Sequence, residues 1–262
     1  MRSVSCVLLR QSLQTIDCTH GEQKIGYLFR MLRPTLILIG TLLATSTAYA
    51  NGQTTHLWIT DTAIEHVQDD DLAALLRSQS GPLRVGTMFP DGGYAVDHGY
   101  GEAAHWEPFQ DAYRDWIREN FSDLDSDEAA PHIAFYLGLA SHGMADQVFD
   151  SMYMERSRVY DADGWADGAT SLDTAQDIVF AALTTPQTVP EMWIPDPFPS
   201  LFEHIGVEVD MSTMLDGQDR LELAVLGVGG LSEVEATVAL NEEAFPWGCS
   251  HLLDEAVPGA PP

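Results

Sequence analysis

Residues 133–146 read IAFYLGLASHGMAD. Apolar residues surround a helical face here, and Pro131 stands where the first turn of a helix accepts proline. We therefore predict a long, largely buried helix over residues 133–154. His142 and Asp146 lie four residues apart on it, so their side chains stack on one face. Such a pair is either a hydrogen bond within the helix or part of a metal site. The apolar surroundings favour the metal site, because burying a carboxylate is costly unless it is paired or metal-bound.

Helical periodicity dominates the rest of the chain, and no stretch alternates as a set of strands would. Further helices are expected over residues 61–67, from Asp71, and over 108–121, 170–183, 218–226 and 232–244. A Gly- and Asp-rich loop is expected over 85–104, a proline-bearing loop up to Pro199, and a turn at Gly229-Gly230. With no repeat and no linker, the sequence predicts one all-α, multi-helix domain.

Composition limits the partners of the protein. The 262 residues are 45% hydrophobic, which excludes a disordered chain. Lys and Arg number 12 against 40 Asp and Glu, and the formal net charge is -28. Contacts to nucleic-acid phosphates need basic side chains, so we expect no stable nucleic-acid binding and no docking on strongly anionic membranes.

The N-terminal residues carry an export pattern. From Met31 a positive charge at Arg33 precedes an apolar run and an Ala-Tyr-Ala cleavage motif that ends at Ala50. We expect a signal peptide over residues 31–50 and a secreted or periplasmic protein. Residues 1–30 are either an unusually long leader or the result of a start codon assigned too early, and Met31 is the better start. A retained membrane anchor is the alternative, but the run is short for a spanning helix. The mature domain is expected over 51–257 without a transmembrane segment, followed by a disordered tail over 258–262.

Two more groups of residues offer metal ligands. Asp91 is expected in a tight turn, and His105 near the start of a helix, with His98 either in the same loop or in solvent. After cleavage, Asn51 becomes the terminal residue, and its amine and carbonyl can chelate one ion together with His56, expected ahead of a helix. The single mature cysteine, Cys249, lacks an activating neighbour and is expected to be a small buried residue.

These segments together resemble the zinc-dependent phospholipase C family, and within it the catalytic domain of glycosylphosphatidylinositol-specific phospholipase D. The order and spacing of the segments carry the likeness, which extends from residue 51 to about residue 180. The segments are Thr55-His56-Leu57-Trp58-Ile59, residues 85–91, His98, His105-Trp106-Glu107-Pro108-Phe109, Ile117-Arg118-Glu119-Asn120 and residues 134–146.

The resemblance implies an all-α fold of the phospholipase C and P1 nuclease type that holds zinc and hydrolyses phosphodiesters of phospholipids or glycolipid anchors. One zinc ion would be held by Asn51, His56 and a bridging Asp146. A second would be held by Asp91, His105, His142 and the same Asp146. Two such ions bind phosphoryl oxygens and activate a water, which Asp91 would orient or deprotonate as the catalytic residue.

The sequence departs from the family pattern at the third metal. The corresponding positions are Asp150, Ala169 and Asp173, where the family has two histidines and an acidic residue, and no histidine occurs between His142 and His204. Asp150 and Asp173 would either hold a harder ion through oxygen alone or mark a lost site. The remaining histidines, His66, His132, His204 and His251, are expected to be structural or surface residues.

Three functions follow from these observations. The leading hypothesis is a secreted metal-dependent phosphodiesterase acting on phospholipid or glycolipid-anchor headgroups, with peripheral contact to a membrane. The acidic charge favours zwitterionic or neutral headgroups, or a high-salt medium that screens the repulsion. The alternatives are a non-catalytic, metal-stabilised lipid-binding protein and a P1-type single-strand nuclease, the latter disfavoured by the shortage of basic residues.

Overall fold

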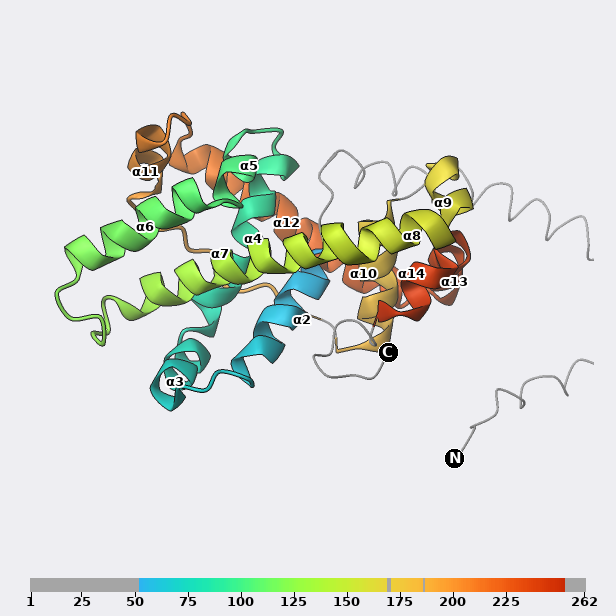
Figure 1. Ribbon diagram of the computed structural model, residues 1–262, viewed down its shortest axis with the longest axis horizontal. Helices are drawn as coiled ribbons and strands as arrows, with labels where there is room; N and C mark the ends of the chain where they lie inside the picture. The colour runs from blue at the N-terminus through green and yellow to red at the C-terminus, as the bar shows by residue number, and fades with distance from the viewer. Residues whose placement is uncertain (1–51, 169–170, 186, 253–262) are drawn as a thin grey trace, which may run out of the picture. The chain divides into compact units, whose positions relative to one another are not determined.

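The computed structural model describes residues 52–168, 171–185 and 187–252. These residues are helical apart from their connections and include no β-strand, which confirms the predicted all-α class (Figure 1). The predicted leader, signal peptide and tail, over 1–30, 31–50 and 258–262, lie outside the described residues, as does Asn51.

The helices follow one another along the chain and are given in two sets, up to Val148 and after it. The first set comprises α2 (Gln53–Ile64), α3 (Asp70–Ser78), α4 (Ser80–Ala95), α5 (Tyr100–Ala104), α6 (Glu107–Asn120) and α7 (Ala130–Val148). The second comprises the π-helix η1 (Phe149–Met154), α8 (Glu155–Tyr160), α9 (Ala162–Asp167), α10 (Leu172–Leu183), α11 (Phe198–His204), α12 (Met211–Ser232), α13 (Glu235–Ala244) and α14 (Pro246–Ser250).

The predicted long helix is present, although its last part is not α-helical. Residues 130–148 form α7, and the chain continues as η1 and then α8 in one nearly continuous rod (Figure 1). A π-helix is wider than an α-helix and rotates the residues that follow it, and such insertions occur often at functional sites. Asp150 lies in this π-helical segment, just beyond the His142 and Asp146 pair.

The loop predicted over 85–104 is wrong, because most of it forms α4 and α5. Glycine suggests a loop in the sequence, but Gly86 of α4 has a packing role. Gly86 and Gly138 of α7 lie where these two helices cross. A Cβ on Gly86 would lie 2.2 Å from the carbonyl oxygen of Phe135, and one on Gly138 would lie 2.1 Å from that of Leu83. The glycines of α4 therefore serve close helix packing instead of a loop.

Two further boundaries also differ from the sequence prediction. The first helix begins at Gln53 instead of Asp61, so His56 lies inside α2 and not ahead of a helix. The helix α12 passes through Gly229-Gly230 without a turn, and the chain turns only after Ser232. A Cβ on either glycine would meet no atom within 4 Å, so neither is required there by packing.

An aromatic core lies beside the crossing of α4 and α7. Phe89 of α4 and Phe109 of α6 meet Phe198 and Phe202 of α11, and the rings of Phe109 and Phe202 stack with centroids 3.9 Å apart. The sequence predicts a proline-bearing loop up to Pro199, but residues 198–204 form a helix, in which Phe198 and Phe202 are fully buried.

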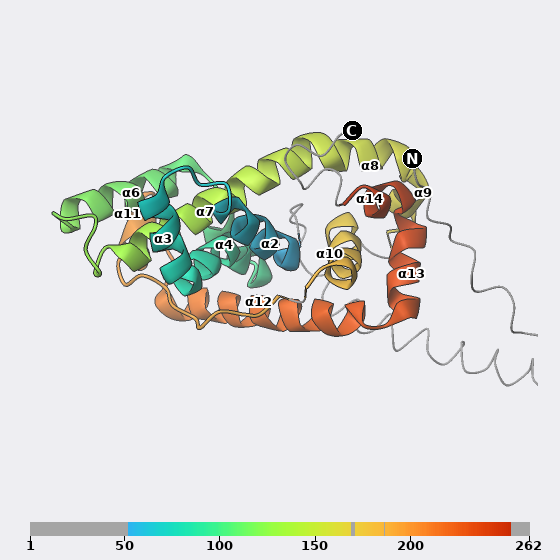
Figure 2. The same cartoon turned by 90° about the horizontal axis from the view of Figure 1, so that it is seen from below.

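A layer of helices separates α7 and α8 from α12. Figure 2 shows α12 along the side of the domain opposite to α7 and α8, with α2, α4 and α10 between them. Consistent with this arrangement, α4 packs against both α7 and α12, and α10 packs against both α2 and α12.

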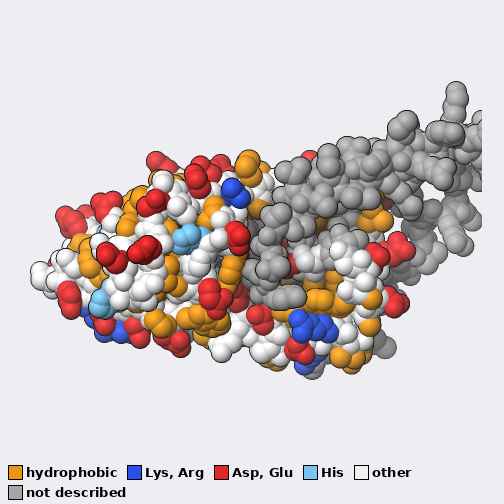
Figure 3. Space-filling view, turned by 90° about the horizontal axis from the view of Figure 1, so that it is seen from above, with side chains coloured by type: hydrophobic (Ala, Val, Ile, Leu, Met, Phe, Trp, Pro, Cys, Tyr) orange, Lys and Arg blue, Asp and Glu red, His pale blue; other side chains and the backbone are white. Residues whose placement is uncertain are grey.

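Among the described residues, no single helix is long and apolar enough to cross a membrane. The helices α12 and α13 meet the length and composition criteria only as a pair, which is bent by 100°. On the face shown in Figure 3, acidic side chains far outnumber Lys and Arg, as the composition requires.

Candidate metal centre

The α7 helix presents His142 and Asp146 on one buried face, as their spacing predicts. His142 is 0% exposed and Asp146 is 5% exposed. The Nε2 atom of His142 lies 3.1 Å from Oδ2 of Asp146. Two residues four apart on an α-helix face the same way, so this half of the site follows from local geometry.

Asp91 of α4 and His105, which follows α5, complete a cluster with this pair. One potential ligand atom from each of Asp91, His105, His142 and Asp146 lies within 4.8 Å of the others. The Nε2 atom of His105 lies 3.2 Å from Oδ2 of Asp146 and 3.6 Å from Oδ1 of Asp91. Asp91 lies within α4, so the predicted tight turn at this position is wrong. All four residues are buried.

The two imidazoles of the cluster have their lone pairs directed at its centre. Nδ1 of His142 is 2.7 Å from the carbonyl oxygen of Thr87, and Nδ1 of His105 is 2.7 Å from that of Gly101. A carbonyl only accepts, so each Nδ1 carries the proton and donates, which leaves Nε2 unprotonated in the neutral ring. Metal-ligating histidines are held in this way by carbonyl or carboxylate partners.

The centre of the cluster is short of positive charge. The two Nε2 atoms of His105 and His142 are 2.9 Å apart, and Oδ1 of Asp91 makes no hydrogen bond among the described residues. Facing lone pairs repel unless a proton or a cation lies between them. The donor set of two imidazoles and two carboxylates is one that zinc binds, so the residues present fit a divalent ion.

The pKa values of the cluster show the same demand for a cation. Burial alone would lower the pKa of His105, yet the carboxylates of Asp146 and Asp91 raise this pKa to about 10. Burial alone would raise the pKa of Asp146, yet His142 and His56 hold this pKa well below its ordinary value. Both shifts favour the state in which positive charge lies beside the carboxylates.

His56 joins the cluster from α2 and contacts the other oxygen of Asp146. Its Nε2 atom lies 2.9 Å from Oδ1 of Asp146, while Oδ2 of Asp146 faces His105 and His142. The ring of His56 stacks on that of His142 with centroids 3.9 Å apart. Asp146 therefore contacts two separate sets of imidazoles, one with each of its oxygens.

Three other candidate residues lie outside the four-residue cluster. Asp150 in η1 and Asp173 in α10 are partly buried and are not members of it. Burial and neighbouring carboxylates, chiefly Asp146 for Asp150 and Asp91 for Asp173, raise the pKa of each to about 6. His98 is also outside, and its Nδ1 accepts a hydrogen bond from the backbone N–H of Tyr100 at 3.1 Å.

Two polar residues near the cluster have no signal in the sequence. The side-chain amide of Gln53 donates to Oδ2 of Asp91, on the side away from the imidazoles. Asp177 of α10 is 2% exposed and accepts hydrogen bonds from the first turn of α2. Neither belongs to a recognisable motif, because each meets its partner only through the packing of helices distant in sequence.

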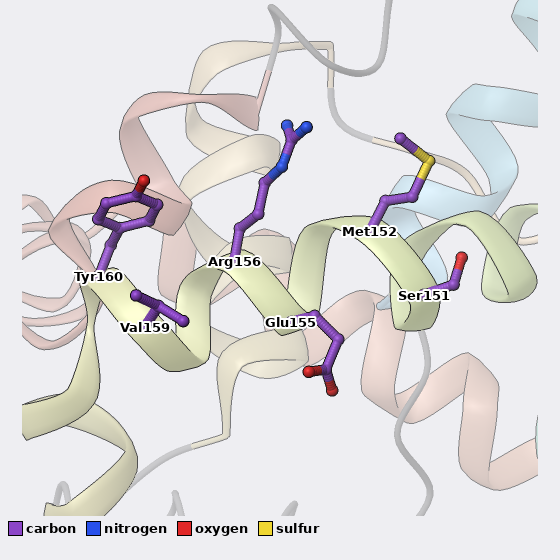
Figure 4. A pocket seen from close by; sticks show the side chains of 6 residues that line it. All are labelled: Ser151, Met152, Glu155, Arg156, Val159 and Tyr160. Atoms are coloured by element: carbon purple, nitrogen blue, oxygen red, sulfur yellow. The ribbon is translucent and has the colours of Figure 1, made fainter.

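The remaining residues of interest lie away from the cluster. His66 and His204 are exposed, and His132 accepts or donates a hydrogen bond to the Tyr113 hydroxyl at 2.9 Å. Cys249 is buried, as predicted, and burial raises the pKa of its thiol to about 12. A hollow of about 360 Å³ lies along η1 and α8, shares no residue with the cluster, and is lined by Ser151, Met152, Glu155, Arg156, Val159 and Tyr160 (Figure 4).

Comparison with known proteins relates part of the chain to one kind of enzyme. It is 32% identical over 139 residues to phosphatidylinositol-glycan-specific phospholipase D of Bos taurus, covering 49% of this chain and 16% of that protein. The Rattus norvegicus protein of the same name is 29% identical over 130 residues, and the Homo sapiens protein 29% over 138. The chain resembles phospholipases over about half its length.

This similarity supports a phospholipase-like family, while the wider resemblance to zinc-dependent phospholipase C stays a prediction. The matched part of the chain spans about one sixth of the length of these relatives, 16% in the Bos taurus protein. No family model matches the chain, and no solved structure does.

Proposed function

We propose that the protein is a metal-dependent phosphodiesterase that hydrolyses phospholipid or glycolipid-anchor headgroups. The observation that carries this proposal is the buried cluster of Asp91, His105, His142 and Asp146, whose ligand atoms lie within 4.8 Å of one another. The similarity to phosphatidylinositol-glycan-specific phospholipase D, a lipid-headgroup hydrolase by its name, supports the same class of substrate.

The residues divide into two ligand sets that share Asp146. Asp91, His105 and His142 would hold one zinc ion with Oδ2 of Asp146, and His56 would hold a second with Oδ1, completed by the terminal Asn51. Divalent ions bound at such a pair of sites supply positive charge to phosphoryl oxygens and lower the pKa of a water.

The chain's own residues then orient the reactants and accept a proton. Oδ1 of Asp91 is buried, faces the imidazoles and makes no hydrogen bond among the described residues, so it would be a ligand of the ion and would also orient or deprotonate the attacking water. Gln53 donates to Oδ2 of the same carboxylate and so holds its orientation. The carbonyls of Gly101 and Thr87 keep the Nε2 atoms of His105 and His142 turned toward the site.

The charge of the protein narrows the substrate. With a net charge of -28, the protein repels anionic molecules that approach from a distance, and repulsion extends over about a Debye length. A zwitterionic or neutral headgroup avoids this repulsion, and only its phosphate needs to meet the ions. We therefore propose zwitterionic or neutral headgroups, with contact to the membrane limited to its periphery.

Purified protein provides the first test of this function. The metal content is measured by elemental analysis, and hydrolysis of phosphatidylcholine, a glycolipid-anchored protein and single-stranded DNA is followed with and without chelator. We expect at least two zinc ions per chain and chelator-sensitive release of a headgroup or anchor. In His142→Ala both metal and turnover should be lost, whereas the matched variant His66→Ala, at an exposed histidine outside the cluster, should retain them. Protein without metal, or DNA as the only substrate, would overturn the proposal.

A non-catalytic lipid-binding protein is the second candidate, and one observation favours it. The third-metal positions lack histidine, and Asp150 and Asp173 do not join the cluster among the described residues. This candidate predicts two bound ions, binding to lipid vesicles and no hydrolysis of any of the three substrates. A hard cation such as Mg²⁺ or Mn²⁺ that restores hydrolysis would instead support an oxygen-only third site.

We also propose export of the mature chain, on the evidence of the pattern in residues 31–50. N-terminal sequencing of protein recovered from the medium or periplasm of the producing cell should begin at Asn51. Protein that stays inside the cell with Met31 attached would contradict both the export and the role of Asn51 as a ligand.

A further inference from the structure

The first turn of α2 lacks a cap of its own. The N-cap residue is Gly52, which has no side chain to accept the N–H groups that start the helix. A helix leaves its first N–H groups without internal partners, and a side chain at the N-cap normally accepts from the second and third helical residues. In α2 these are Thr54 and Thr55, which immediately precede His56.

Asp177 of α10 replaces the missing cap. Its Oδ2 accepts the backbone N–H of Thr54 at 3.1 Å, and its Oδ1 accepts the backbone N–H of Thr55 at 2.8 Å and the Thr55 hydroxyl at 2.9 Å. A side chain at position 52 would not fit, because its Cβ would lie 2.2 Å from Cβ and Cγ of Asp177. Asp177 thus occupies the place that an N-cap side chain would fill.

This contact supports the residues that face the metal cluster. Gln53 and His56 belong to the same helical turn, and they contact Asp91 and Asp146 respectively. The backbone N–H of His56 itself bonds to the carbonyl of Gly52 at 3.0 Å, so the position of His56 depends on how the turn begins. A chain of contacts therefore runs from α10 through the start of α2 to both carboxylates of the centre.

We propose that Asp177 is a positioning residue for the metal ion held by His56 and Asp146. By fixing the first turn of α2, it holds His56 at Asp146 and sets the affinity of this ion. The ion at Asp91, His105 and His142 depends mainly on α4, α5 and α7, and meets this turn only through the contact of Gln53 with Asp91. The inference rests on the proposed function in requiring that metal binds at all.

The chain offers a matched control in Asp161. This carboxylate is 3% exposed and caps α14 in the same way, accepting the backbone N–H groups of Trp247 at 2.7 Å and Gly248 at 2.9 Å. These are also the second and third residues of their helix, and Phe245 at the N-cap provides no side-chain cap. Asp161 is not among the residues of the metal cluster.

The test compares Asp177→Ala with Asp161→Ala in the metal-loaded protein. Metal affinity is measured by competition with a chromogenic chelator, and stability by thermal unfolding. Outer-shell substitutions lower metal affinity by about 10–100-fold. We expect a loss of that size for the ion held by His56 and Asp146 in Asp177→Ala, with the other ion retained. Asp161→Ala should lower the unfolding temperature without changing either affinity.

A second substitution separates capping from charge, because Asp177→Ala also removes a negative charge near the ions. Asp177→Asn removes this charge but keeps one acceptor oxygen for the N–H groups of the first turn of α2. We expect Asp177→Asn to lose less affinity than Asp177→Ala. Gly52→Ser alone, with Asp177 in place, should be overcrowded and should lower the affinity for the same ion.

The outcomes distinguish this inference from the proposed function. Wild-type protein that binds no metal would overturn the proposed function. Wild-type protein with two ions, and an Asp177→Ala variant with unchanged affinity for both, would overturn only the role of Asp177, as would an equal loss in Asp161→Ala. If Asp177→Ala fails to fold, Asp177→Asn keeps the volume and one acceptor oxygen and must still weaken the ion at His56.

Discussion

The surroundings of Asp146 and those of Asp150 and Asp173 shift the pKa values of these carboxyl groups in opposite directions. Asp146 on α7 lies among imidazoles, and they hold its pKa well below the ordinary value despite burial. Asp150, four residues later in η1, faces burial and the charge of Asp146, and its pKa rises to about 6, as does that of Asp173. The charged form of a carboxylate in this interior is favoured where imidazoles surround it, and it is disfavoured where burial and other carboxylates act on it.

Removing the central carboxylate should have the largest effect. Asp146→Asn leaves a neutral amide between His56 and the pair of His105 and His142, so we expect both ions to be lost. Hydrolysis should fall by more than about 100-fold, because even outer-shell changes cost up to that much. Elemental analysis and turnover of phosphatidylcholine measure both. Asp167→Asn, an exposed residue at the end of α9, is the control, and unchanged metal content in Asp146→Asn would contradict the shared role of Asp146.

Removing the metal with a chelator should lower the unfolding temperature of the protein, because the imidazole-rich group, His56, His105 and His142 around Asp146, loses its ions. Metal that binds only the folded protein stabilises it by about 2.7 kcal/mol when free metal is 100-fold above Kd. For a domain of this size, that corresponds to about 5–10 °C in Tm. Scanning calorimetry of metal-loaded and chelated protein measures the difference. An equal shift on chelating His142→Ala would show that the stabilising ion binds elsewhere.

The packing of α4 against α7 should affect metal binding by the imidazole-rich group more than it affects the surroundings of Asp150 and Asp173. A Cβ on Gly138 would lie 2.1 Å from a backbone carbonyl oxygen, so Gly138→Ala must move α4 away from α7. We expect a loss of about 1–3 kcal/mol in stability and weaker metal binding, measured by denaturant unfolding and chelator competition. Gly229→Ala, with nothing within 4 Å, should leave both unchanged or raise stability slightly.

The smallest effect should come from substituting Asp150 in the metal-free protein. A folded-state pKa of about 6 for Asp150, above its value of 3.8 in a free chain, means that the folded state binds more protons between these pH values. The ionised carboxylate therefore costs stability as pH rises from about 4 to 6, and the cost stays constant above that. Asp150→Asn should raise stability at pH 7 by up to about 1 kcal/mol after solvent screening, with no gain below pH 4.

The same substitution also tests the third site. If an ion binds Asp150, Asp150→Asn lowers stability in the presence of Mg²⁺ or Mn²⁺ while raising it in their absence. Thermal unfolding at pH 7 in both conditions gives the answer. A loss of stability in the metal-free protein would show that Asp150 is held by a favourable partner and would remove the contrast with Asp146.

Glycine accounts for two of the differences between the sequence prediction and the structure. The sequence predicts a loop over residues 85–104 and a turn at Gly229-Gly230, but most of the first stretch and all of the second are helical. Glycine weakens a helix by about 1 kcal/mol relative to alanine, but tertiary packing outweighs this. At Gly86 and Gly138 the helices approach so closely that a larger residue would clash. The propensity of a residue shows only the local cost, and the packing that offsets it is invisible in a single sequence.

Helical class, the facing pair His142 and Asp146, and the ligand chemistry of Asp91, His105 and His56 were all determined by the sequence itself, because periodicity and side-chain type are local properties. The resemblance to a known family already implied that these residues meet around Asp146. The tertiary structure alone decided which oxygen of Asp146 faces which imidazole, and that Gln53 and Asp177 support the centre. Asp177 lies 122 residues from Thr55, its nearest bonded partner. Such contacts depend on how closely helices distant in the chain cross, and no short stretch of sequence records that.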